Sequence, residues 1–252
     1  MINLNGKVAL VTGGSRGIGA AVALLFAKAG ADVAITYSSN RKSATRVKEQ
    51  IGRLGRICLP LKAQAASANS IRQAVRKTAR EFGRIDILVN NAGIWKRAPI
   101  HSMTEQQWDE TMDVNLKGTY LFCKTVLPLM KKRRGGKIIN IASTAGQRGE
   151  AGYSHYAASK GAVIAFTKSI AAELAPMGIH VNCVAPGWVS TDMTFPTLRN
   201  RSTLRAIKRT IPRGKVASPD DIAGPVLFLA SHLSDHLVGA TLSVNGGGVM
   251  IT

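Results

Sequence analysis

The stretch that decides the fold is Lys7-Val-Ala-Leu-Val-Thr-Gly-Gly-Ser-Arg-Gly-Ile-Gly19, near the start of this 252-residue chain. Its first half, residues 7–12, is a short β-branched apolar run that predicts a buried strand. Glycines follow, and residues 20–29 are good helix formers throughout. Gly30 ends that helix, and residues 32–36 predict a second strand. Strand, glycine-rich turn, helix and strand in this order form the βαβ unit that binds nucleotides.

The glycines of the turn follow the pattern G-x-x-x-G-x-G, whereas the commoner dinucleotide-binding pattern is G-x-G-x-x-G. Without side chains, glycines let the backbone approach a pyrophosphate, and the N-terminus of the next helix faces its negative charge. A glycine-rich turn alone can be structural punctuation, but its place between a strand and a helix favours cofactor binding. We expect contacts to the cofactor from Gly13, Ser15, Arg16, Gly17, Ile18 and Gly19.

The end of the second predicted strand indicates which dinucleotide binds. An NAD site usually has an acidic residue there, which bonds the ribose 2′-hydroxyl. Residues 33–48 contain no acid, and hydroxyl and cationic side chains stand there instead. Such groups suit a 2′-phosphate, so the sequence predicts NADP(H). The alternative is that the cations are ordinary solvated residues at a helix start. The residues expected near the phosphate are Arg16, Tyr37, Ser38, Ser39 and Arg41.

The motif Tyr156-Ala-Ala-Ser-Lys160 carries the clearest catalytic chemistry. Four residues make about one helical turn, so Tyr156 and Lys160 would lie side by side on one helix face. A phenol has a pKa near ~10, and a neighbouring ammonium lowers it toward the range of a general acid or base. Ser143 follows a predicted strand and could hold a substrate oxygen. A Tyr–Lys pair is often only a surface pair, but the cofactor unit in the same chain favours proton transfer to a carbonyl or from an alcohol.

Several motifs together resemble the short-chain dehydrogenase/reductase family, and the likeness covers essentially the whole chain. The motifs are residues 12–19, Asn90-Asn-Ala-Gly93, Asn115, Ser143, Tyr156 with Lys160, and Pro186-Gly187.

Residues 221–231 and 239–247 are similar to the bacterial 3-oxoacyl-[acyl-carrier-protein] reductases of this family. That likeness implies an NADPH-dependent reductase of 3-oxoacyl thioesters, acting in fatty-acid biosynthesis. The alternative is an NADP-dependent enzyme of the same family that acts on another small carbonyl or alcohol, such as a sugar, polyol, hydroxyacid or polyketide.

The resemblance also implies a role for each catalytic residue. Tyr156 would protonate the substrate oxygen, and Ser143 would hold that oxygen. Lys160 would lower the pKa of the tyrosine and bond the nicotinamide ribose. Asn115 would anchor a water that links Lys160 to solvent.

Further cofactor contacts follow from the resemblance. Gln64 stands after the third strand, where the family often has an acid near the adenine, and its amide could still bond the adenine amino group. Tyr153 would shape the substrate pocket, whereas His155 would point to another side of the helix. The remaining expected cofactor residues are Ala65, Asn91, Ala92, Gly93, Pro186, Gly187, Val189 and Thr191.

The rest of the chain predicts one α/β domain over residues 1–252. Apolar strand-like runs recur at residues 85–90, 137–142, 180–184 and 241–244, with helical patterns between them. This alternation predicts a single-domain Rossmann-like fold, a doubly wound parallel sheet with helices on both faces. The resemblance adds a substrate lid at approximately 190–216 and a homotetramer.

Composition argues for the cytoplasm. No apolar run approaches the ~20 residues that span a bilayer, and the first strand begins too early to leave room for a signal peptide. The three cysteines are odd in number, widely spaced and set among apolar residues, so we expect free thiols, with no disulfide and no metal site.

The formal net charge is +20, from 34 lysines and arginines against 14 acidic residues. Two basic clusters, residues 131–134 and 199–215, could attract an acidic acyl carrier protein near the active site, or merely aid solubility. Nucleic-acid binding is a second hypothesis, but only 5% of residues are aromatic and no recognition motif is present, so we expect no specific nucleic-acid partner. A third is an inactive binding module, which the intact catalytic set argues against.

Overall fold

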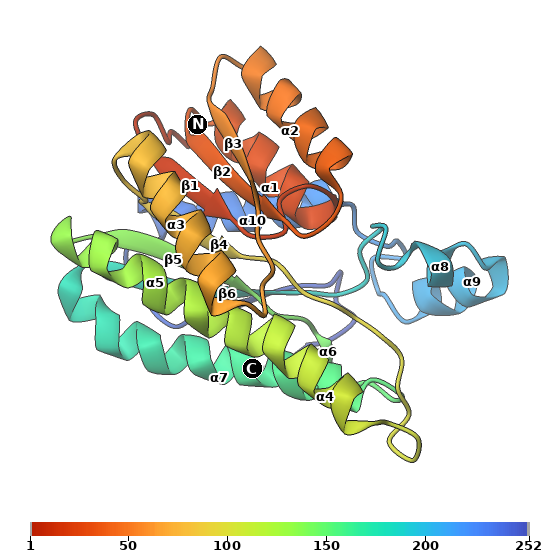
Figure 1. The fold of residues 1–252 in the computed structure, drawn as a ribbon. Helices are drawn as coiled ribbons and strands as arrows, with labels where there is room; N and C mark the ends of the chain where they lie inside the picture. The colour runs from red at the N-terminus through yellow and green to blue at the C-terminus, as the bar shows by residue number, and fades with distance from the viewer. Residues whose placement is uncertain (1, 251–252) are drawn as a thin grey trace.

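Seven parallel strands cross the centre of the computed structural model, which describes residues 2–250 (Figure 1). They lie side by side in the order β3-β2-β1-β4-β5-β6-β7. Strands of a parallel sheet are continuous apolar runs because helices cover both faces, and every run predicted to be a strand forms one. The strands are β1 (Val8–Val11), β2 (Asp32–Tyr37), β3 (Cys58–Lys62), β4 (Ile87–Asn90), β5 (Gly136–Ile141), β6 (Ile179–Pro186) and β7 (Thr241–Val244).

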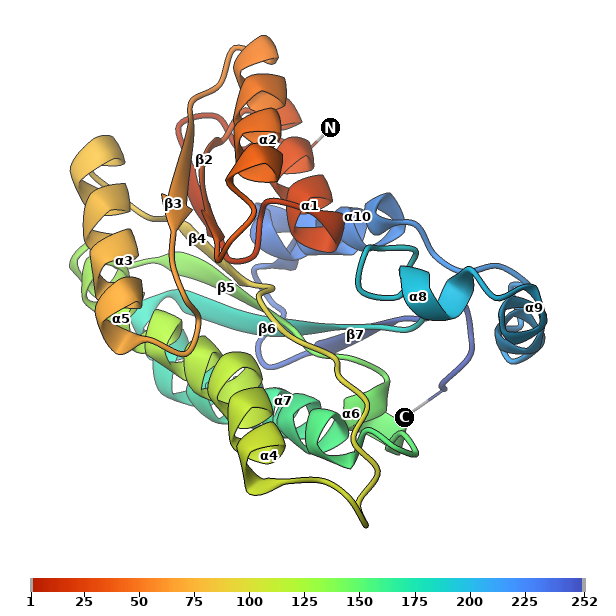
Figure 2. The same cartoon turned by 45° about the vertical axis from the view of Figure 1, so that its right-hand side comes forward.

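Helices cover both faces of this sheet (Figure 2). Each face has its own apolar core. Phe26 is fully buried in the core of one face, and Phe122 is buried in that of the other. The predicted doubly wound α/β class is therefore confirmed. The first face carries α1 (Gly17–Lys28), α2 (Arg41–Arg53) and α10 (Pro219–Ala230), and the second carries α3 (Ala68–Phe82), α5 (Gly118–Lys132) and α7 (Ser154–Leu174).

Shorter elements lie around the carboxyl ends of the strands. The helix α4 (Glu105–Met112) runs through a π-helical turn, Asp113–Lys117, into α5. The four-residue helix α6 (Ala145–Arg148) follows β5. The carboxyl ends of parallel strands all lie at the same edge of the sheet. The elements that follow these ends therefore meet there and form one wall of the space above the sheet.

The segment between β6 and α10 projects from the body and contains α8 (Phe195–Leu198) and α9 (Arg201–Arg209) (Figure 2). Ile207 of α9 is buried, whereas the basic side chains of this helix are exposed. The segment coincides with the predicted lid, whose motion stays a prediction.

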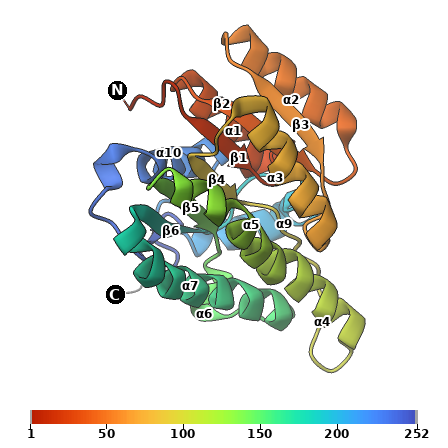
Figure 3. The ribbon, with the colours of Figure 1, turned by 60° about the vertical axis from the view of Figure 1, so that its left-hand side comes forward.

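The basic cluster Lys131–Arg134 corrects one expectation. Its side chains are exposed, but α5 starts at the carboxyl edge of the sheet and ends just before β5 begins. The cluster therefore lies at the amino edge, opposite the end of β5 that leads to Ser143, and not on the active-site face. Figure 3 brings this edge forward. The prediction was wrong because a crossover helix carries its last residues back across the whole sheet.

Cys58, Cys123 and Cys183 are buried free thiols, as expected, and burial raises the pKa of each. Within residues 2–250, no helix is both long and apolar enough to cross a membrane. The same residues contain no grouping of three or more histidine, cysteine, aspartate or glutamate side chains that could hold a metal ion.

Candidate active site

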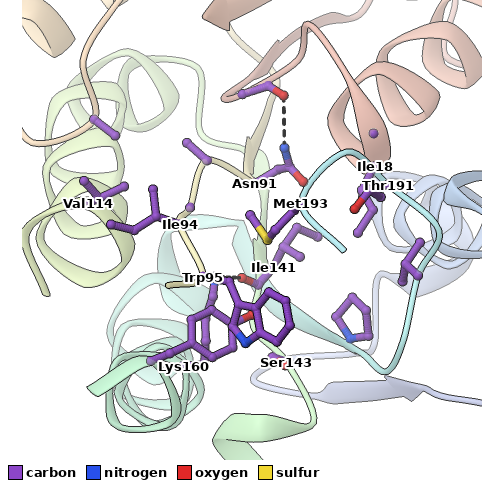
Figure 4. Close-up of a pocket in the computed structure, with 18 of the residues that line it drawn as sticks. Ile18, Asn91, Ile94, Trp95, Val114, Ile141, Ser143, Lys160, Thr191 and Met193 are labelled. Carbon is purple, nitrogen blue, oxygen red and sulfur yellow. Dashed lines mark hydrogen bonds between the residues drawn. The ribbon is translucent and has the colours of Figure 1, made fainter. Parts of the chain in front are cut away.

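A cavity of about 580 Å³ lies at the carboxyl ends of the strands (Figure 4). The strand order reverses direction between β1 and β4, and ligands of open α/β sheets bind above such a switch point. The glycine-rich turn, the ends of β2, β4, β5 and β6, and the start of the projecting segment all line the cavity.

The glycine-rich turn has a backbone that only glycine adopts easily. Gly13 and Gly17 have φ angles of +63° and +53°, in the left-handed region that side chains disfavour. A Cβ on Gly19 would lie 2.4 Å from the carbonyl oxygen of Gly13. Asn91 fixes the turn, because its Nδ2 donates to the carbonyl oxygens of Thr12 at 2.9 Å and Gly13 at 3.2 Å. The turn is thus preformed for a close backbone approach.

Arg16 stands at the N-cap of α1 and lines the cavity. Its guanidinium lies 3.6 Å from Asp192, and both side chains are largely exposed, so the pair contributes little stability. The first turn of α1 holds no acid, which leaves the positive end of the helix open to an anion.

Ser143, Tyr156 and Lys160 line one part of the cavity. Ser143 follows β5, and the other two lie one turn apart on α7, as predicted. Lys160 is buried, its Nζ donates to the carbonyl oxygen of Ile141 at 2.8 Å, and this nitrogen lies 6.0 Å from the centre of the Tyr156 ring.

Burial dominates the protonation of this pair. It raises the pKa of Tyr156 to about 12, although the Ser143 hydroxyl acts to lower that pKa. It lowers the pKa of Lys160 to about 8. Lys160 is not among the groups that shift the pKa of Tyr156 in this geometry, in which its ammonium donates to Ile141. The lowering of the tyrosine pKa by Lys160 stays a prediction.

Asn115 does not line the cavity but braces it from behind. It lies in the π-helical turn, a feature often found at functional sites. Its Oδ1 accepts from the backbone N–H of Ile94 at 2.8 Å, and its Nδ2 donates to the Ile94 carbonyl at 3.0 Å and to Ser159 Oγ at 3.1 Å. These bonds tie the segment after β4 to α7.

The other side of the cavity holds residues that the motifs did not reveal. Trp95 stacks on Tyr153, with ring centres 4.5 Å apart, and meets Trp188 edge-on at 5.7 Å. Its Nε1 donates to Glu150 Oε2 at 3.2 Å. Tyr153, which was expected to shape the substrate pocket, does not itself line the cavity but stacks on a residue that does. The lining residues that the sequence did not predict are Trp95, Arg148, Glu150, Trp188 and Met193.

The predicted cofactor residues divide into two groups. Gly19, Ser39 and Arg41 lie outside the cavity lining, Gly19 because it packs beneath the turn and Arg41 because it begins α2. The predicted cofactor residues that do line the cavity are Gly13, Ser15, Arg16, Gly17, Ile18, Tyr37, Ser38, Gln64, Ala65, Asn91, Ala92, Gly93, Tyr156, Lys160, Pro186, Gly187, Val189 and Thr191.

His155 is buried, and burial lowers its pKa. Its ring nitrogens have no hydrogen-bond partner among the described residues.

Residues 13–248 match a family model described as "Enoyl-(Acyl carrier protein) reductase". The 3-oxoacyl-[acyl-carrier-protein] reductase FabG of Vibrio cholerae is 43% identical over 250 residues, which cover 99% of this chain and 100% of that protein. The chain belongs to the short-chain dehydrogenase/reductase family. The FabG of Thermotoga maritima is a further relative of this short-chain dehydrogenase/reductase, 41% identical over 249 residues that cover 99% and 100% of the two chains.

Solved short-chain dehydrogenase structures agree with this assignment. One from Burkholderia cenocepacia, in complex with NADP, has a TM-score of 0.92 at 37% identity and covers 98% of this chain and 99% of its own. A putative short-chain alcohol dehydrogenase from Sinorhizobium meliloti has a TM-score of 0.94 at 32% identity, covering 98% and 97%. As a short-chain dehydrogenase/reductase, the chain is an oxidoreductase that uses a nicotinamide cofactor.

Proposed function

We propose that this chain reduces 3-oxoacyl groups, carried on an acyl carrier protein, to 3-hydroxyacyl groups with NADPH. The observation that carries the proposal is a single cavity in which the glycine-rich turn meets Ser143, Tyr156 and Lys160. Relatives at 40 to 43% identity over nearly the whole chain are 3-oxoacyl-[acyl-carrier-protein] reductases. This likeness favours a 3-oxoacyl thioester over other carbonyl compounds.

The residues at the cavity fit a dinucleotide. A Cβ on Gly93 would lie 3.1 Å from Asn115 Oδ1, and a Cβ on Gly17 would lie 3.2 Å from the methyl group of Thr191. Glycine at both positions keeps the backbone close without closing the space. When bound, NADPH supplies the hydride, and the chain supplies position and the proton.

Tyr156 is the proposed proton donor to the substrate carbonyl oxygen. A phenol is protonated at neutral pH at its ordinary pKa near ~10, and burial raises the pKa of Tyr156 further. The protonated phenol is the form that a reduction needs. Ser143 would donate a hydrogen bond to the same oxygen. Lys160 would stabilise the phenolate left after the transfer and hold the nicotinamide ribose, and Asn115 would anchor the water that links Lys160 to solvent.

The preference for NADPH is proposed from the charge around the cavity. Arg16 lines it beside Tyr37 and Ser38, and residues 33–48 contain no acid that would repel a 2′-phosphate. Gln64, which also lines the cavity, is the proposed contact to the adenine.

The proposal extends to partner and assembly. An acidic acyl carrier protein would meet the basic segment 199–215, which adjoins the cavity, rather than the cluster at the amino edge. We further propose a cytoplasmic homotetramer. Trp108 of α4 and Tyr120 of α5 are each 39% exposed, and such aromatic side chains are typical of surfaces that a second copy covers.

A second candidate is a reductase of a small hydroxylated carbonyl, such as a sugar or polyol precursor. The observation that favours it is the substrate side of the cavity, where the rings of Trp95 and Trp188 and the Glu150 carboxylate line the space. A carboxylate accepts hydrogen bonds from hydroxyl groups.

NADPH oxidation with an acetoacetyl thioester tests the proposal, run beside NADH and a panel of ketones, aldehydes and sugars. Fast turnover of the thioester with NADPH and slow turnover with NADH is the expected result. An inert thioester together with turnover of a sugar would replace the first candidate by the second. No turnover of any compound in the panel would contradict both candidate functions.

A further inference from the structure

Glu150 is an acid on the substrate side of the cavity, in the short connection between α6 and α7. It is half-buried, and its Oε2 accepts the hydrogen bond from Trp95. It forms no ion pair within residues 2–250, and Oε1 accepts no hydrogen bond there. The Oε1 oxygen of the Glu150 carboxylate is therefore available to a substrate that enters the cavity.

The aromatic wall fixes this carboxylate. Trp95 is held by stacking on Tyr153 and by its edge contact with Trp188, so its indole N–H is a fixed donor to Glu150. The exposed Arg148 is a cation that acts on Glu150, and Arg97 acts on Tyr153. Neither makes an ion pair with Glu150, so the negative charge is only partly offset.

Glu150 also acts on the reacting centre. Its carboxylate lines the same cavity as Ser143 and Tyr156, and its charge is felt by the Tyr156 phenol. Charges in a partly desolvated cavity interact more strongly than in water. A second carboxylate brought close to this centre would meet a like charge, which is strongly unfavourable.

We propose that Glu150 is a specificity-determining residue, which excludes carbonyl compounds with a carboxylate near the reacting carbonyl and admits uncharged ones. The next step rests on the proposed thioester substrate. The negative charge of Glu150 makes the enzyme reduce the acyl group while it is bound as a thioester, and not the free 3-oxo acid that hydrolysis of the thioester releases. The thioester and the acid differ at that position by one negative charge.

Methyl acetoacetate and acetoacetate test the proposal, because they differ mainly in that charge. Burial raises the pKa of Glu150, so the comparison is made at pH 8, because a higher pH favours the carboxylate. We expect kcat/KM at this pH to favour the ester in the wild type. Glu150→Gln should raise kcat/KM for acetoacetate by about tenfold and change that for the ester by less than about threefold, since it removes repulsion from one substrate only. An unchanged ratio between the substrates would overturn the proposal.

Two control variants separate charge from shape. Glu110→Gln removes another acid that lines the cavity, but Glu110 is already neutralised by Lys96 at 2.7 Å, so the ratio should stay at the wild-type value. Glu150→Asp keeps the charge and should keep the preference for the ester. NADPH binding, followed by fluorescence, checks that each variant is folded, and Glu150→Ala replaces the glutamine variant if that one does not bind.

The test is separate from the thioester assignment. If neither the ester nor an acetoacetyl thioester is reduced, the thioester substrate is wrong, and the effect of Glu150 is measured on 2,3-butanedione and pyruvate instead. This pair also differs in a carboxylate beside the carbonyl. A selective gain for pyruvate in Glu150→Gln would support the role of Glu150, and equal effects on both would refute it.

Discussion

The two sides of the cavity differ in how their side chains are held. On the cofactor side, backbone geometry and local hydrogen bonds fix the shape of the cavity. An example is the glycine-rich turn, which Asn91, just after β4, holds by two hydrogen bonds. On the substrate side, side chains from separate connections decide, with Trp95 after β4, Glu150 before α7 and Trp188 after β6. The first side is built to hold one ligand, whereas the second can change its residues without disturbing the sheet.

Tyr156→Phe should produce the largest effect and separate the two sides most sharply. It removes the proposed proton donor but leaves the ring and its packing in place. Turnover should fall by about 10²–10⁴-fold, the usual contribution of a general acid, while the NADPH Kd should change little. Steady-state rates and fluorescence titration measure the two quantities. Substantial residual turnover would remove Tyr156 from proton transfer.

Gly19→Ala should damage the cofactor side alone. The new Cβ would stand 2.4 Å from the Gly13 carbonyl and 2.5 Å from Asn91 Nδ2, and such overpacking costs about 1–3 kcal/mol. If that strain falls on the turn, the NADPH Kd should rise about tenfold or more, since 1.4 kcal/mol is a factor of ten.

Gly52→Ala is the matched control. Gly52 lies in α2, and a Cβ there would meet nothing within 4 Å. Alanine should leave NADPH binding unchanged and raise stability slightly, by about 0.4–1 kcal/mol. Equal NADPH affinity in both variants would show that the turn tolerates a side chain and that its glycines are not needed for binding.

The same contrast explains what could be predicted from the sequence. The strand pattern, the turn and the four-residue Tyr–Lys spacing each express a local rule, and the structure has all of them. Trp95 and Glu150 escaped notice because they are 55 residues apart and no local pattern joins them. Burial raises the pKa of Tyr156, and the burial of one side chain cannot be read from the spacing of two residues.

Arg16→Gln should have a smaller effect, limited to the choice of cofactor. Arg16 lines the cavity and Arg41 does not, so the two arginines that the sequence proposed together should now differ. The KM for NADPH should rise about tenfold in Arg16→Gln, within the range for a hydrogen bond to a charged group, and that for NADH should barely change. Arg41→Gln is the comparison and should change the NADPH KM less. Equal shifts for both cofactors would mean that Arg16 does not contact the 2′-phosphate.

The smallest effect should come from neutralising exposed basic residues. This prediction compares two basic regions of the surface instead of the two sides of the cavity. Neutralising Arg201, Arg205 and Arg209 to glutamine should lower kcat/KM for a carrier-linked substrate by a few-fold at low salt, because exposed charges mainly steer association. The same change at Lys131, Lys132 and Arg133 should have less effect, because these residues lie at the opposite edge of the sheet from the cavity.

A short thioester without the carrier distinguishes docking from damage to the site. Its kcat/KM should be unaffected by either triple variant, and the loss with the carrier-linked substrate should disappear at high salt, where screening shortens the reach of the charges. A larger loss from the Lys131 set than from the Arg201 set would move the docking surface to the amino edge. Since one chain places that edge far from its own cavity, the carrier would then have to serve the cavity of another copy.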